Sequence, residues 1–599
     1  MERESLRTEY TEASKSYSEA AEHEEKKLFL ISLARLITFA AGITVSWICF
    51  TFSIVLGIIA LIGSLILFIW LIKLYSSHTD KKEFLKNLAV LNATEARVLT
   101  GDFTSLSPGN EYTDPDHPFS YDTDLFGNSS LFQYLNRTVT GYGRDILASW
   151  LKDPFPLSRD INKRQKAVRE LAEKKIWRHN FIASGMSNPV EKQNMEPVIG
   201  WINDEATQLS GIHRYLIIIL PATAFLTLSL LVAGVLHYSF FTLSVTINLL
   251  YVFSGIRNTG RIHNALSGRY MQLASVKKLL LLFETESFES EIMKDIRDNL
   301  AGRPESASES VLKLEKIIRA FDSRLNLIAG LVLNGLFLWD YQCIRRLEIW
   351  KRKNRGSFSS WLDMIGKADA FISLAGYYYN NQTYAFPVLV EDDRVISVKS
   401  MGHPLLEEKE RICNDFELSG KGRVCVITGA NMAGKSTFLR TLSVNLILAM
   451  NGAPVCGVSM LFRPVKLFTS MRTTDSLSSH ESYFYAELKR LGQLKTLVEN
   501  GEPVLFILDE ILKGTNSNDK SLGSRLFIKK LIAAGGTGVI ATHDISLGEL
   551  DSEYSGILFN KCFEVEIDND KISFDYILRD GITRKMNAAI LMKQMGILD

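Results

Sequence analysis

Residues 429–436 read GANMAGKS and fit the pattern G-x-x-x-x-G-K-[ST]. Loops of this pattern wrap phosphate groups with backbone N–H groups, and their glycines permit a close approach. Residues 423–428 form an apolar run typical of a buried strand, and residues 436–450 have the pattern of a helix. A helix that begins at the loop directs the positive end of its dipole at a bound phosphate. The stretch therefore predicts a nucleotide site in an α/β domain.

Two side chains of this loop can contact a bound phosphate or its metal ion. Lys435 can reach the outer phosphates, and the Ser436 hydroxyl can ligate Mg²⁺. A chance Gly/Lys/Ser turn is the alternative, and the flanking strand and helix argue against it. We predict that ATP is bound by Gly429, Asn431, Met432, Ala433, Gly434, Lys435, Ser436 and Thr437.

Two further apolar runs end in polar residues. Residues 504–508 are followed by Asp509, which can hold the Mg²⁺ shell together with Ser436, and by Glu510, which can orient or deprotonate a water. Residues 538–542 are followed by His543, which could contact the γ-phosphate or its water. A histidine in a loop is the alternative for His543 taken alone. We predict that Glu510, His543 and Lys435 are catalytic.

Bulk composition sets wider limits. A chain of 599 residues is too long for one core, and its net charge of +1 gives no global basic field. The six cysteines form no C-x-x-C pair, which indicates buried thiols in a reducing compartment, without a disulfide framework or zinc site.

Two long apolar stretches predict membrane helices. Residues 36–72 contain no charged side chain over 37 positions, and within residues 215–256 His237 is the one Asp, Glu, Lys, Arg or His. A single helix over the first stretch would be roughly 55 Å long, against a hydrocarbon core of about 30 Å. We therefore predict two transmembrane hairpins, with turns near residues 47–53 and 237–239. Two buried hairpins of a large soluble protein are the alternative, which these lengths disfavour.

The charges that flank both stretches predict the orientation. Lysines and arginines flank the apolar stretches, and neither predicted turn contains one. The flanking residues are Lys26, Lys27, Lys73, Lys81, Lys82, Arg214, Arg257 and Arg261. The positive-inside rule then places the termini and the soluble parts in the cytoplasm. Arg35 would lie within the first crossing and extend to the interface. We expect an integral protein of the inner (cytoplasmic) membrane.

Three motifs in order along the chain resemble those of the MutS family of DNA mismatch repair ATPases. They are TGANMAGKST at 428–437, LDEILKGT at 508–515 and ATH at 541–543. Segments around the motifs are similar to MutS as well: 402–405, 414–415, 475–487, 574–581 and 587–588, and, for the start of the helical core, 130–151.

The resemblance implies an α+β multidomain protein. A C-terminal ABC-class P-loop α/β ATPase domain would follow an all-α MutS-like core and lever region, which the transmembrane hairpins interrupt. It also implies a homodimer with composite ATP sites, in which Ser482 of one subunit contacts the γ-phosphate held by the other, and it makes DNA a possible partner.

We divide the chain into seven expected segments. They are a polar tail (1–27), transmembrane hairpin 1 (28–73), a connector (74–125), the first part of the MutS-like core (126–212), transmembrane hairpin 2 (213–256), the lever and second part of the core (257–380) and the ATPase domain (381–599). The patterns further predict one helix over 131–151, a buried core helix over 325–338, a β-hairpin over 388–398 and a terminal β-hairpin over 565–578.

The chain also departs from the family pattern. Ala430 and Ala433 replace a proline and a glycine that are usual in the loop, both at variable positions. No mismatch-reading N-terminal domain with its Phe-x-Glu wedge is visible, and neither is a C-terminal dimerisation extension. We therefore expect a membrane-anchored MutS-like ATPase coupled to mismatched or structured DNA. The alternatives are a nucleotide-switched membrane scaffold that does not bind DNA, and an ABC-type transporter, against which the lack of an LSGGQ-type segment argues.

Overall fold

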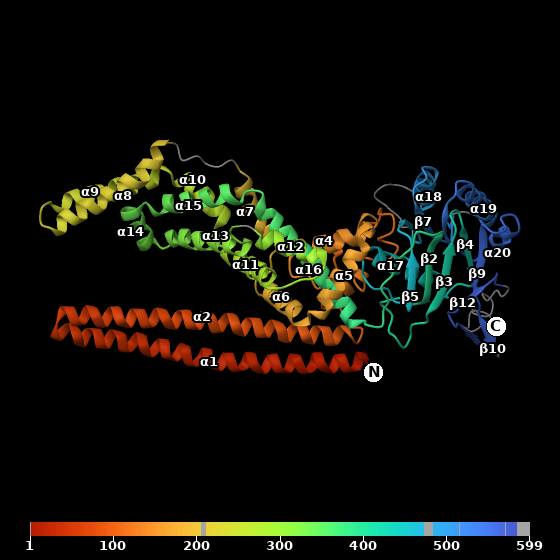
Figure 1. Cartoon of the computed structure of the whole chain (residues 1–599), viewed down its shortest axis with the longest axis horizontal. Coiled ribbons are helices and arrows are strands. Elements are labelled where there is room, and N and C mark those ends of the chain that lie inside the picture. The colour runs from red at the N-terminus through yellow and green to blue at the C-terminus, as the bar shows by residue number, and fades with distance from the viewer. Residues whose placement is uncertain are drawn as a thin grey trace.

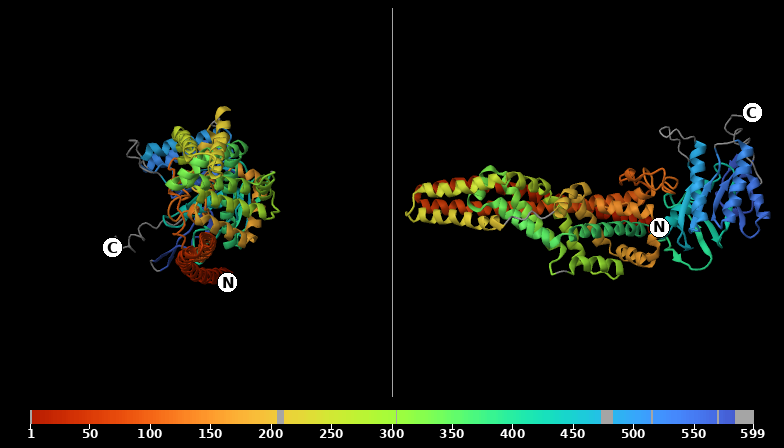
Figure 2. Two further views of the ribbon diagram at one scale, coloured as in Figure 1. Left: turned by 90° about the vertical axis from the view of Figure 1, so that its left-hand side faces the viewer. Right: turned by 90° about the horizontal axis from the view of Figure 1, so that it is seen from above.

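The computed structural model describes residues 2–204, 211–302, 304–472, 483–513, 516–568 and 571–583. It is an elongated α+β molecule, in which a sheet domain adjoins a helical body, one helical hairpin extends from the far end of the body and a longer one runs alongside it (Figure 1). The turns of both hairpins lie at the end of the molecule remote from the sheet domain (Figure 2).

The first hairpin consists of two very long helices, α1 (Glu2–Phe52) and α2 (Ile54–Val98). They meet at Ser53, inside the predicted turn. Neither helix contains a proline, and each continues without a break from the apolar stretch into polar sequence. The expected polar tail and the first part of the connector are therefore the helical base of this hairpin.

A buried polar network fastens the base of the first hairpin to the helical body. Glu95 of α2 accepts hydrogen bonds from Arg137 Nε at 2.5 Å and from Asn380 Nδ2 at 2.7 Å. The Tyr10 hydroxyl of α1 donates to Asn380 Oδ1 at 2.9 Å. Burial alone would raise the pKa of Glu95, but Arg137 outweighs it and holds the pKa below its ordinary value. Both helices of the hairpin are thus attached at one point.

Helices make up the body of the molecule. They are α3 (Leu131–Leu135), α4 (Gly141–Lys152), α5 (Ile161–Glu173), α6 (Lys175–Ser187), α7 (Lys192–Asn203), α10 (Ile256–Leu266), α11 (Tyr270–Thr285), α12 (Glu291–Ala301), α13 (Ala307–Asp322), α15 (Trp339–Asn354) and α16 (Ser357–Asn380).

The prediction of one helix over residues 131–151 is wrong, because the chain breaks between α3 and α4. The Asp369 carboxylate of α16 accepts from the backbone N–H groups of Val139 and Thr140. The Thr140 hydroxyl in turn accepts from Gly143 N at 2.9 Å and caps α4. The break is set by a residue that is distant in sequence.

The second hairpin consists of α8 (Gly211–Val232) and α9 (Tyr238–Ser254). Its turn occupies residues 233–237, slightly before the predicted position, and His237 caps α9. Helix α14 (Leu327–Phe337) packs beside this hairpin. The prediction of a buried core helix over 325–338 is wrong, since Leu327 and Ile328 are about three-quarters exposed.

A six-stranded sheet forms the centre of the sheet domain. Its order is β12-β9-β4-β8-β7-β6, and all neighbours are parallel except β12 and β9. The strands are β4 (Val424–Gly429), β6 (Lys466–Ser470), β7 (Val504–Asp509), β8 (Thr537–Thr542), β9 (Leu558–Phe563) and β12 (Leu578–Asp580).

Helices cover both faces of this sheet. Helix α17 (Lys435–Met450) packs on one face, while α18 (Tyr483–Glu499) and α19 (Ser517–Ala533) pack on the other; the short α20 (Ile545–Gly548) follows β8. The three predicted strands and the helix after the loop are confirmed.

A second sheet has the order β1-β5-β2-β3. Its strands are β1 (Val388–Leu389), β2 (Arg394–Met401), β3 (Asn414–Ser419) and β5 (Ser459–Phe462). The prediction of a β-hairpin over 388–398 is wrong, because β5 lies between β1 and β2 and pairs with both. The terminal hairpin is confirmed as β10 (Glu566–Asp568) and β11 (Lys571–Ser573). Leu578, expected on its second arm, instead pairs with Phe563 of β9.

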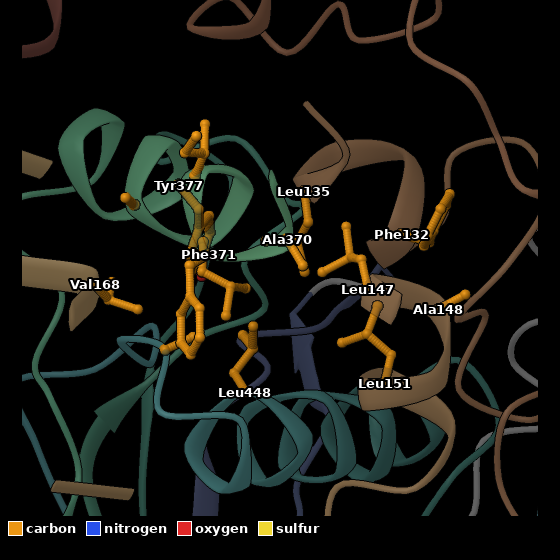
Figure 3. Close-up of a cluster of buried hydrophobic side chains, with 14 of the residues drawn as sticks. Phe132, Leu135, Leu147, Ala148, Leu151, Val168, Ala370, Phe371, Tyr377 and Leu448 are labelled. Atoms are coloured by element: carbon orange, nitrogen blue, oxygen red, sulfur yellow. The ribbon is translucent and has the colours of Figure 1, made fainter. Parts of the chain in front are cut away.

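One apolar core joins the helical body to the sheet domain. In Figure 3, Leu448 of α17 lies near Phe371 of α16, and both belong to the same buried cluster as Leu151 of α4. Arg164 of α5 reinforces the joint, because its guanidinium lies over the Trp150 ring at 3.9 Å and its Nε donates to the Asn451 carbonyl at 2.8 Å. The helix that begins at the GANMAGKS loop thus ends against the helical body.

The network at the base of the first hairpin can be tested by Arg137→Ala. Removing one partner of a buried ion pair costs about 3–5 kcal/mol, because the other charge remains buried and unpaired. We expect a clear fall in the melting temperature of the purified protein in detergent, measured by differential scanning calorimetry. Arg97→Ala, which alters an exposed arginine of α2, serves as the matched control and should melt like the unmodified protein. Equal melting temperatures for both variants would contradict this role of the pair.

Candidate functional site

The loop after β4 has close neighbours at its two glycines. A Cβ on Gly429 would lie 3.0 Å from the Phe563 carbonyl oxygen. Gly434 has φ +102° and directly precedes α17, where a side chain would be strained and would also meet Tyr576. The described geometry therefore explains both glycines of the pattern.

Lys435 lies inside the curve of the loop. Its Nζ donates to the carbonyl oxygens of Gly429 at 2.5 Å and of Ala430 at 2.8 Å. Burial lowers the pKa of Lys435, while the carboxylates of Asp509 and Glu510 act in the opposite direction. In the described chain the ammonium group thus donates to two loop carbonyl groups, which an anion could replace.

The two predicted metal ligands meet in space. Ser436 Oγ, in the first turn of α17, donates to Asp509 Oδ2 at the end of β7, at 2.5 Å. Within the described parts of the chain, no three His, Cys, Asp or Glu side chains gather as a metal site. One hydroxyl and one carboxylate fit Mg²⁺, which usually takes few protein ligands and fills its octahedron with water and phosphate oxygens.

Glu510 is held in an unusual conformation beside this pair. Its φ is +61°, and its N–H donates to the Ala541 carbonyl of β8 at 2.9 Å. Its carboxylate contacts His543 Nδ1 at 3.0 Å and accepts from Lys520. Burial tends to raise the pKa of Glu510, but Lys520 and His543 outweigh it and hold the pKa below its ordinary value. The structure thus places Glu510 as an ionised carboxylate and brings His543 to it.

Lys520 of α19 was not among the predicted site residues. It lies in no recognisable motif, and its contact with Glu510 depends on how α19 packs on the sheet. A partly buried carboxylate at a strand end favours a positive partner nearby, and this preference is the one signal that the sequence offers for Lys520.

Glu487 of α18 is a second residue of this region without a predicted role. Its carboxylate accepts from the backbone N–H groups of Leu512 at 2.6 Å and Lys513 at 3.1 Å. Leu512 has φ +61°, a conformation that costs a branched residue about 1–2 kcal/mol. Burial raises the pKa of Glu487. Glu487 thus connects α18 to the strained turn that carries Glu510.

A cavity of about 610 Å³ opens beside the loop. Its walls include the loop, Asp509 and Glu510, and also side chains for which the sequence predicted no contact with a ligand. These are His403, Ile412, Asn414, Phe574 and Tyr576. Asn414 fixes Tyr576 in place, since its Nδ2 donates to the Tyr576 carbonyl at 3.0 Å. The cavity walls combine a lysine and loop backbone with aromatic side chains, a lining that suits a nucleotide.

Ser482 lies outside the described residues, as do residues 473–481 before it. The chain that leads into this segment is firmly held. Asp122, from the connector, accepts from Arg472 N at 2.8 Å and from the Thr469 hydroxyl at 2.6 Å. The connector therefore packs against the sheet domain.

Comparisons with known proteins match two parts of the chain. A family model described as MutS domain III matches residues 116–375, and one described as MutS domain V matches residues 425–596. The chain belongs to the MutS family. The domain V match contains the loop, Asp509, Glu510 and His543, and the domain III match runs across α8 and α9.

Individual MutS relatives are similar over different lengths. The chain is 25% identical over 511 residues to the DNA mismatch repair protein MutS of Aquifex pyrophilus, covering 76% of this chain and 56% of that protein. It is 30% identical over 241 residues to the protein of the same name from Thermotoga maritima, covering 39% of this chain and 29% of that protein. It is 28% identical over 235 residues to the MutS protein homolog 4 of Mus musculus, covering 38% and 24%. The chain thus spans little more than half of the first of these relatives and less of the others.

The role of Glu487 can be tested by hydrogen exchange. In Glu487→Ala, the N–H groups of Leu512 and Lys513 lose their acceptor, and we expect these two amides to exchange faster in mass-spectrometric measurements. Glu499→Ala, which alters an exposed glutamate on the same helix, is the matched control. Unchanged exchange at residues 512–513 would show that the turn does not depend on Glu487.

Proposed function

We propose that this chain is a membrane-anchored ATPase of the MutS family, which acts as a dimer and couples ATP turnover to DNA binding. The observation that carries the proposal is the convergence of Lys435, Ser436, Asp509 and Glu510 on one cavity. These four residues come from two segments of the chain, 435–436 and 509–510, and the fold brings them together.

The proposed roles follow from the contacts. Backbone N–H groups of the loop and Lys435 would hold the phosphates of ATP, and Ser436 and Asp509 would hold Mg²⁺, which would neutralise phosphate charge when bound. Glu510, kept ionised by Lys520 and His543, would orient or deprotonate water. Ser482 of the partner subunit would complete the site.

Membrane anchoring is supported by the two apolar hairpins. Three helices, α1, α2 and α8, are long and apolar enough to cross a bilayer, and at most about a tenth of their apolar windows is buried in the protein. Two bent helix pairs, α9 with α10 and α14 with α15, would raise the number to five. Arg35, next to the apolar stretch of α1, places its guanidinium over the ring of Tyr75 at 5.1 Å, a contact that stabilises a charge near lipid. We place the soluble parts in the cytoplasm, by the distribution of lysine and arginine.

Dimerisation and DNA binding are proposed from the family. Two of the relatives above carry DNA mismatch repair in their names, whereas the mouse protein is named only as a MutS homolog. A nucleotide-switched membrane scaffold would have the same ATP site and the same hairpins, so DNA binding is the property that separates the two functions.

ATP chemistry can be tested with two variants of the full-length protein in detergent. We expect Lys435→Ala to lose ATP binding, and Glu510→Gln to retain binding but to lower kcat by about 10²–10⁴-fold, the usual contribution of a general base. Phosphate release and binding of a fluorescent ATP analogue are the measurements. Lys421→Ala changes an exposed lysine just before β4 and should behave like the unmodified protein. Turnover that survives in both site variants would refute the assignment.

DNA coupling can be tested by titrating the protein with plain, mismatched and branched duplexes at several salt concentrations. If six or more phosphates are contacted, the affinity should fall by about 10³-fold or more between roughly 50 and 200 mM salt. ATP turnover should also rise with the preferred DNA. A chain that hydrolyses ATP but shows no salt-dependent DNA affinity would instead be a membrane scaffold.

A further inference from the structure

Helix α14 presents an apolar face that no part of the described protein covers. Leu327 and Ile328 are 76% and 75% exposed, and Leu331 and Val332 are 51% and 52% exposed. These spacings place the four side chains on one side of the helix. From Asn326 to Trp339 the sequence contains no charged residue. Exposure of this apolar face to water is therefore energetically unfavourable.

The opposite face of α14 packs on α9 of the second hairpin. Asn248 of α9 is fully buried, and its Nδ2 donates to the Gly335 carbonyl at 2.7 Å. A Cβ on Gly335 would lie 3.0 Å from Val245, so a glycine here permits the close approach. Asn248 lies within the long apolar run of the hairpin, where an amide needs a partner inside the protein. That partner belongs to α14, so α14 lies beside the apolar run of α9, at the same level along the hairpin.

Polar groups at the end of α14 are turned inward. The chain bends by 77° between α14 and α15, with Leu338 at φ +50°. Asp340 is almost fully buried; its N–H donates to Asn334 Oδ1 at 3.0 Å, and its carboxylate pairs with Arg324 at 3.2 Å. Leu338 packs with Ile217 and Val252 at the base of the hairpin. Asp340 at the bend is thus buried, and its charge is paired with that of Arg324. A segment surrounded by hydrocarbon must satisfy its polar groups within the protein in this way.

We propose that α14 is a third lipid-contacting element, a half-inserted helix whose outer face meets the acyl chains of the cytoplasmic leaflet. This inference rests on the proposed membrane anchoring of the two hairpins. Eleven residues extend roughly 16 Å, about half of a hydrocarbon core, so α14 enters the bilayer without crossing it. The exposed Arg345 of α15, beyond the bend, places the chain that follows α14 on the cytoplasmic side.

Lipid is favoured over a protein partner by the composition and the position of the face. It offers no polar group to a protein, whose interfaces carry about one hydrogen bond per 100–200 Å². It is also continuous with the apolar surface of the hairpin, since Phe337 contacts Phe225 of α8 with ring centroids 5.2 Å apart.

The test uses the full-length protein with an environment-sensitive nitrobenzoxadiazole label. Cys49→Ala and Cys413→Ala remove the two thiols that are not buried. Single cysteines are then introduced as Leu331→Cys on α14, Leu226→Cys on α8 as the bilayer reference, and Lys294→Cys on α12 as the exposed control. The labelled proteins are reconstituted in phosphatidylcholine–phosphatidylglycerol vesicles with nitroxide groups at a shallow or a deep position of the acyl chain.

We expect the label at position 331 to be quenched by the lipid nitroxides to at least half the extent seen at position 226, and more strongly by the shallow nitroxide than by the deep one. The label at position 294 should be quenched by aqueous iodide alone. Quenching at 226 without quenching at 331 would overturn the inference and leave the membrane anchoring intact. If position 331 were protected from lipid and iodide alike, a second copy or another protein would cover the face, which also overturns it. Absence of lipid quenching at both 226 and 331 would refute the anchoring itself.

Discussion

The pairing of Glu95 with Arg137 is the constraint on which the arrangement of the long hairpin depends. Each charge is buried and would be costly alone, so neither can leave without the other. Asn380 and Tyr10 extend the pair into a network that includes both arms of the hairpin and the last turn of α16. A hairpin of two very long helices needs fixed points at its base, and Asn87 of α2, which donates to the Ala183 carbonyl of α6 at 3.0 Å, adds a further one. The network gives it one direction relative to the helical body.

Helix α17 connects the sheet domain to the helical body. Helix α17 has the phosphate-loop residues at its start and the Arg164 contact just beyond its end, so any shift of the loop along the helix axis reaches α5 directly. On the opposite face of the sheet, Glu487 links α18 to the turn beside Glu510. Two rigid helices therefore connect the candidate site with the body and with the segment that precedes α18.

The sequence predicted those parts of the fold whose signal is local. Buried parallel strands are continuous apolar runs, and β4, β7 and β8 were predicted with the polar residues that end them. What the sequence could not predict depends on partners far along the chain. The break at Thr140 is made by Asp369, strand β5 enters between β1 and β2, and Lys520 reaches Glu510 only because α19 packs on the sheet. Helix α14 was misassigned for another reason: an apolar run has the same composition whether protein or lipid surrounds it.

Both hairpin turns lie at one end of the molecule, and the sheet domain lies at the other. Beyond the apolar stretch, α2 continues from Lys73 to Val98, which corresponds to roughly 40 Å of straight helix. Anchored as proposed, every molecule in a membrane would carry its sheet domain at the same height above the lipid surface. Two sheet domains would then meet by lateral diffusion within a plane, so that surface density, rather than bulk concentration, would set how often a composite ATP site forms.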